Sequence, residues 1–176
     1  MVAIVGLGGC GKGRRAASAK ASESPFPRQD VTVQSGSFTA RNEKSATREV
    51  QYTVHWTEAD LEIDPSKKGG MAKVRGITGE LFEDGKVSAT FAASEGVLNQ
   101  LEKTMKVKGQ VKVTSKATPD TLTCEEMDYA AKDEIIKARG KVYWTGPNGK
   151  VGPMDELWAS RDLKRVATPN LFQGVR

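Results

Sequence analysis

The feature that most constrains the fold of this chain is a four-residue phrase that recurs about every 30 positions. The phrase reads basic, small apolar, basic, glycine, and its copies end at Gly76, Gly109 and Gly140. Alternating apolar and polar residues follow the last two glycines. Self-similarity at a fixed period is typical of one supersecondary unit stacked several times. The chain is therefore predicted to consist of stacked repeats.

Alternation with a period of two indicates that the repeated unit is built from strands. Between Val50 and Trp56 apolar and polar residues alternate, which puts His55 on the polar face and favours a solvated histidine over a catalytic one. Asp84-Gly85 lies between two alternating runs and is a strong hairpin signal. These patterns predict an all-β chain.

Two segments, 125–139 and 155–167, also have the composition of helices. The first ends just before Gly140, which could stop a helix. The matching segment of the preceding copy contains Gly96 at mid-span, which suits a long helix poorly. Because the repeat outweighs residue propensity, we expect strands in both segments, with a turn at Lys132–Glu134 in the first.

Composition limits the function classes that fit the chain. Its 176 residues suit one domain, and a net charge of +5 favours acidic partners such as nucleic acid, anionic lipid headgroups or a phosphorylated glycolipid. His55 is the only histidine, and Cys10 and Cys124 have no zinc-ligand spacing. No carboxylates are spaced as an acid/base pair. We therefore predict a protein that is not an enzyme, with no cofactor and no metal.

The first 15 residues fit three incompatible patterns. A P-loop would need serine or threonine at Gly13, and a dinucleotide-binding unit would have to include Pro25 and Pro27. A lipoprotein processing site needs a short apolar run and small residues before a cysteine, which residues 2–10 supply. The third pattern is favoured.

The predicted organisation follows from that choice. Residues 1–10 are a short or truncated signal-like segment, whose missing basic region would lie upstream, and Cys10 is the lipidation site. A free thiol at Cys10 is the alternative. Residues 11–30 are too poor in apolar side chains to fold and form a disordered linker. Residues 31–176 form the folded domain.

From about Trp56 to Phe172 the chain resembles a known family. The residues that carry the resemblance are Val74–Gly76, Phe91–Ala93, Gly109–Val113, Leu122–Tyr129, Ile136–Val142 and Leu163–Phe172. They are similar to the OstA-like family of periplasmic lipopolysaccharide-transport proteins, and to LptC more than LptA. The resemblance implies a twisted antiparallel β-jellyroll of two facing sheets, whose apolar interior shelters the acyl chains of lipopolysaccharide.

The resemblance also implies partners and a location. Open edges of such jellyrolls pair with the next jellyroll, and LptC-like members are anchored in the inner membrane beside an ATP-driven (ABC) exporter. The expected function is a periplasmic, membrane-anchored jellyroll that binds and relays lipopolysaccharide or a similar envelope lipid. The alternative is an adaptor of the same fold with no lipid cargo.

Two sets of side chains are candidates for contact with the lipid. The inward set would line the interior or simply form the core, and it consists of Val107, Val111, Val113, Leu122, Tyr129, Ile136, Val142 and Trp144. The outward basic set is Lys106, Lys108 and Lys112, which would meet lipid phosphates or form a solvated face. No aromatic residues are interleaved with these lysines, so nucleic-acid binding is not expected.

Overall fold

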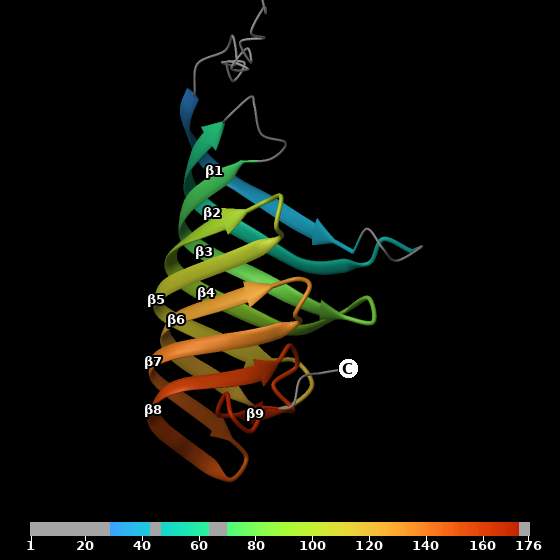
Figure 1. The fold of residues 1–176 in the computed structure, drawn as a ribbon, viewed down its shortest axis with the longest axis vertical. Helices are drawn as coiled ribbons and strands as arrows, with labels where there is room; N and C mark the ends of the chain where they lie inside the picture. The colour runs from blue at the N-terminus through green and yellow to red at the C-terminus, as the bar shows by residue number, and fades with distance from the viewer. Residues whose placement is uncertain (1–28, 43–46, 64–69, 173–176) are drawn as a thin grey trace, which may run out of the picture.

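The part of the chain that the structure describes folds into one antiparallel sheet of nine strands, which follow each other in sequence order (Figure 1). The structure is a computed structural model, and it describes residues 29–42, 47–63 and 70–172. The strands are β1 (Gln29–Arg41), β2 (Val50–Ile63), β3 (Met71–Glu83), β4 (Lys86–Asn99), β5 (Thr104–Ser115), β6 (Thr121–Ala130), β7 (Ile135–Gly146), β8 (Gly149–Ser160) and β9 (Val166–Ala167). The predicted all-β fold is confirmed.

The sheet is folded over itself, so that its two halves enclose one apolar interior. Figure 1 shows the long strands curling round one side of the molecule, with their front and rear halves facing each other. The pairing register shifts near the middle of β4 to β8, for example between Lys108 and Val111. The two facing layers of the expected jellyroll are thus halves of one continuous sheet, because bulges bend the strands without interrupting them.

The repeated glycine is the residue at which three of the strands bend. Gly76, Gly109 and Gly140 have φ angles of 59°, 79° and 73°, in the left-handed region that glycine adopts without strain. A side chain of the preceding strand lies over each glycine: Thr57, Ser94 and Glu125 have atoms 2.3, 2.9 and 2.6 Å from where a Cβ would be. The repeated glycine of the sequence therefore corresponds to a repeated bend in the sheet.

The segments of mixed propensity are strands, as the repeat predicted. Segment 125–139 contains the end of β6, a turn and the start of β7, and 155–167 contains the end of β8 and all of β9. Asp84 and Gly85 form the tight turn between β3 and β4, with φ angles of 50° and 74°. Both positive angles fit the hairpin turn that an Asp-Gly pair predicts.

Alternation along the strands determines which side chains are inside. On β2, Tyr52 and Val54 are buried and His55 is exposed, as predicted. Gln51 shares the polar face with His55, yet it is buried, and its Nε2 donates a hydrogen bond to the carbonyl of Ala131 at 3.0 Å.

Residues 1–28, which include Cys10, the predicted signal-like segment and nearly all of the predicted linker, lie outside the described residues. β1 begins at Gln29, two residues before the predicted start of the domain.

The Cys124 thiol is buried on β6, and its burial raises the pKa to about 12. Because the thiolate is the reactive form, we expect Cys124 of the folded protein to resist thiol reagents at pH 8. A Cys10→Ser variant retains Cys124 as its one cysteine, so labelling with an aromatic disulfide reagent should be negligible until urea unfolds the chain. Rapid labelling of the folded variant would instead mean that β6 opens locally.

Candidate functional site

Seven of the eight predicted interior residues lie in the tightly packed core. Their side chains are at most 2% exposed and belong to one continuous apolar cluster: Val107, Val111, Val113, Leu122, Tyr129, Ile136 and Val142. The ring of Tyr129 meets that of Tyr52 edge to face, with 5.7 Å between centroids. Trp144 differs, since it is half-buried at the edge of this cluster. The geometry brings the set together on one face of the folded sheet.

Trp144 lines an apolar pocket of about 420 Å³ at the β7–β9 end of the interior. One wall is the inner face of β7 and β8, and the other is the segment from Leu163 to Leu171. Val151 and Leu171 are 51% and 75% exposed, which leaves apolar surface open to solvent beside the pocket. A volume of this size, with mostly apolar walls, is typical of ligand pockets.

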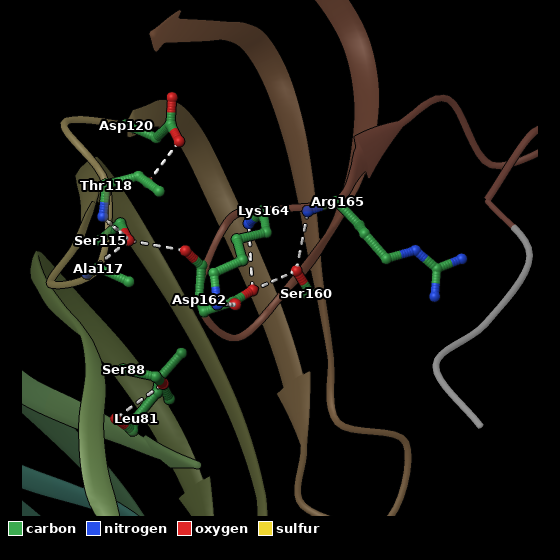
Figure 2. Close-up of polar contacts among 10 residues, drawn as sticks. All are labelled: Leu81, Ser88, Ser115, Ala117, Thr118, Asp120, Ser160, Asp162, Lys164 and Arg165. Atoms are coloured by element: carbon green, nitrogen blue, oxygen red, sulfur yellow. Dashed lines mark hydrogen bonds and ion pairs between the residues drawn. The ribbon is translucent and has the colours of Figure 1, made fainter. Parts of the chain in front are cut away.

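A polar cluster centred on Asp162 holds the second wall in place (Figure 2). Ser160 Oγ and the backbone N–H of Lys164 donate to Asp162 Oδ1 at 2.7 and 3.1 Å, and Lys164 Nζ lies 2.9 Å from Oδ2. Ser115 Oγ, at the end of β5, donates to the carbonyl of Asp162 at 2.7 Å. The cluster therefore joins the segment after β8 to the distant β5.

Burial alone would raise the pKa of Asp162, but hydrogen bonds from Ser160 and Lys164, with the charge of Lys164, lower it below its ordinary value. The ionised cluster therefore stabilises the fold above about pH 4, and this contribution disappears as the pH falls through the lowered pKa.

The residue after Asp162, Leu163, is buried although its φ angle is +60°. A leucine adopts that angle only when its surroundings impose it, and here the cluster and the core do so.

On the outer face, the register aligns charged residues of alternating sign in one row across β2 to β8. The row runs Glu58, Arg75, Glu95, Lys108, Glu126, Arg139 and Glu156, each opposite the next on the neighbouring strand. Arg75 pairs with Glu58, Lys108 Nζ lies 3.2 Å from Glu95 Oε1, and Arg139 Nε lies 3.4 Å from Glu156 Oε1. Exposed cross-strand pairs of this kind each contribute about 0.2–1 kcal/mol.

The three predicted basic residues are all exposed, but their surroundings differ. Lys108 belongs to the alternating row, and Lys106 lies opposite Asp128. Lys112 has Ala92 and Thr123 as its cross-strand neighbours, and it borders a separate outer groove of about 460 Å³ beside His55. Lys112 is thus the member of the set whose charge no directly opposite carboxylate balances.

Among the described residues, no three His, Cys, Asp or Glu side chains converge on a point that could hold a metal ion. Within the same ranges, no helix is long and apolar enough to cross a membrane.

The lining of the apolar pocket includes polar atoms of Asp120 and Trp144, two residues that the sequence pattern did not connect with each other. Asp120 precedes β6 and Trp144 lies near the end of β7, so only the pairing of these strands brings them near each other.

An antiparallel sheet folded over an apolar interior, with a pocket at one end, defines the class of β-jellyroll modules. The family described as "Lipopolysaccharide-assembly, LptC-related" matches residues 62–152, just over half of the chain. The protein belongs to this family. Membership supports a role in lipopolysaccharide transport and implies a periplasmic envelope protein. A comparison with curated protein sequences found no match.

Proposed function

We propose that the protein binds lipopolysaccharide, or a similar amphipathic envelope lipid, in the interior of the folded sheet and relays it. The observation that carries the proposal is the apolar pocket beside Trp144, which continues the core toward solvent at the β7–β9 end. Each acyl methylene that leaves water contributes about 0.8 kcal/mol, so part of one chain gives a reversible affinity. An acyl chain would enter at this end, because the residues deeper inside are closely packed.

The lipid headgroup, in this proposal, stays on the wet outer side. Lys106 and Lys108 have acidic cross-strand neighbours, whereas Lys112 has none directly opposite. An anionic headgroup would therefore gain most from Lys112, and less from Lys106 and Lys108, which each face a carboxylate on a neighbouring strand.

Docking to other jellyrolls is proposed through the open edges of the sheet. β1 is a 13-residue strand that pairs on one side with β2, and its sequence contains neither lysine nor proline, two devices that protect free edges. A strand of another protein could extend the sheet there through backbone hydrogen bonds. The proposal also includes lipidation of Cys10, anchoring in the inner membrane and an ABC exporter as partner.

Photo-crosslinking in cells tests the relay. A photoreactive residue at Trp144 should crosslink to lipopolysaccharide, whereas one at Thr145, which follows it on β7 and is exposed, should not. Crosslinks from position 144 to protein alone would refute lipid transport and identify an adaptor without lipid cargo.

A further inference from the structure

The apolar pocket contains a buried carboxylate oxygen that no described residue satisfies. Asp120 is only 6% exposed and belongs to the lining of the pocket. Its Oδ2 accepts a hydrogen bond from Thr118 Oγ1, as Figure 2 shows, but its Oδ1 has no partner among the described residues. Since buried polar atoms are nearly always paired, an acceptor left over inside a pocket points to a ligand.

A donor of the same kind lies in the same lining. The indole Nε1 of Trp144 is buried and has no partner among the described residues. An indole N–H can only donate, and an ionised carboxylate oxygen can only accept. Asp120 and Trp144 therefore give the pocket an unpaired acceptor and an unpaired donor, set in otherwise largely apolar walls.

Gly146 shows that these two groups are neighbours. A Cβ on Gly146 would lie 2.6 Å from Asp120 Oδ1 and 2.6 Å from Cζ2 of Trp144, the ring carbon adjacent to the one that carries Nε1. Both are closer than a real Cβ tolerates. A glycine at this position therefore preserves the space in which the carboxylate and the indole approach each other.

We propose that this pocket binds an apolar chain that bears a hydroxyl group. A hydroxyl can donate to Asp120 Oδ1 and accept from the Trp144 N–H through a single oxygen atom, while the chain contacts Met154, Leu157 and Leu163. A carboxylate would be repelled by Asp120, because Lys164 in the lining is already paired with Asp162, and an ammonium group has no lone pair for the indole. The inference rests on the proposed function only in taking the chain to be part of an amphipathic lipid.

The hydroxyl should decide the selectivity of the pocket. A chain of equal length without a hydroxyl group would bury the same apolar surface. It would, however, leave the Asp120 carboxylate and the Trp144 indole N–H unpaired and shield both of them further from water. Sites built to bind a hydroxyl discriminate strongly against ligands that lack it, for this reason. We expect the hydroxylated chain to bind at least about tenfold more tightly than the plain one.

The experiment compares two probes on the purified protein: the methyl ester of a long-chain hydroxylated fatty acid, and the unhydroxylated ester of the same length. Titration calorimetry gives both affinities, and NMR follows the indole N–H signals, with that of Trp144 assigned by its loss in Trp144→Phe. The hydroxylated ester should bind more tightly and shift the Trp144 signal. Equal affinities, or no binding of either ester, would overturn the inference.

Variants separate the polar contacts from the shape of the pocket. Trp144→Phe removes the donor and keeps an aromatic wall, and Asp120→Ala removes the acceptor, so each should reduce the preference for the hydroxylated ester to about twofold or less. Gly146→Ala keeps both groups but fills the space between them, and should weaken binding of the hydroxylated ester. A full preference that persists in Trp144→Phe would refute the site even if Asp120→Ala fails to fold.

The outcomes also distinguish this site from the relay of lipopolysaccharide. If crosslinking from position 144 captures lipopolysaccharide while the two esters bind equally, the hydroxyl site is wrong and the relay stands. If the esters differ as expected but no lipopolysaccharide is captured, the pocket binds a hydroxylated chain from another source, such as a free fatty acid, and the relay is wrong.

Discussion

Replacing Gly109 by alanine should lower the free energy of unfolding by about 3 kcal/mol. A residue with a Cβ at a φ angle of +79° costs roughly 1–2 kcal/mol in backbone strain. The added Cβ would also lie 2.9 Å from both Cβ and Oγ of Ser94, and overpacking of this kind costs roughly 1–3 kcal/mol more. Urea unfolding followed by far-ultraviolet circular dichroism measures the change.

Gly85 provides a matched control for the backbone strain. Its φ angle is +74°, close to that of Gly109, but a Cβ there would have no atom within 4 Å. Gly85→Ala should therefore cost only the strain, about 1–2 kcal/mol. A loss in Gly109→Ala no larger than that in Gly85→Ala would contradict a steric origin.

A second substitution should rescue the first. Without the Ser94 side chain, the nearest remaining neighbour of a Cβ at position 109 is the Cα of residue 94, at an ordinary contact distance of 4.0 Å. The Gly109→Ala/Ser94→Gly double variant should therefore lose less than the sum of the two single variants. A strictly additive pair would mean that the bend does not depend on the contact between β4 and β5.

Most interior positions were predictable from the sequence, because the bend in a strand such as β5 adds an even number of residues. In β5 both Gly109 and Gln110 have positive φ angles, and together with Lys108 they lie between the buried Val107 and the buried Val111. The bend adds two residues to the strand, and an even number leaves the period-two pattern intact. Simple alternation therefore puts both valines on the same face. In β6 the buried positions Cys124 and Met127 are three apart, so simple alternation fails there and alignment of the repeats is needed.

The surroundings of the basic residues were not predictable from the sequence. Lys106, Lys108 and Lys112 form a basic stripe when β5 is considered alone. Which carboxylates lie opposite depends on the register of β4 and β6, and that register shifts where the strands bulge. Sequence spacing does not determine the position of each bulge relative to its neighbour, so the pairing of Lys108 with Glu95 emerges only from the folded sheet.

The pocket was only partly predictable. The alternation after Gly140 put Trp144 inside, but the opposite wall comes from Leu163 to Leu171, outside the regular part of the repeats. The bond that holds this wall joins Ser115 to Asp162, 47 residues away, and nothing in the local sequence signals it. A core residue and a lipid-lining residue are also of the same chemical type. Stability measurements can separate these two roles.

Replacing Tyr129 by alanine should lower the free energy of unfolding by about 3–5 kcal/mol, because the side chain is 1% exposed and packs edge to face against Tyr52. Trp144→Ala should cost clearly less, since Trp144 is half-buried beside a pocket that already lacks packing atoms on one side. Urea unfolding of both variants gives the comparison, and Tyr129→Phe, which keeps the ring, is the control and should change stability by about 1 kcal/mol or less.

The ratio of the two losses locates the boundary between core and binding site. A large loss for Tyr129→Ala with a small loss for Trp144→Ala means that the sheet is closed by its own side chains around Tyr129 and open to a ligand near Trp144. A loss below about 1 kcal/mol for Tyr129→Ala would contradict a packed core at that position. The lipid would then reach much deeper into the folded sheet, along Val107 and Val113, than the pocket at the β7–β9 end.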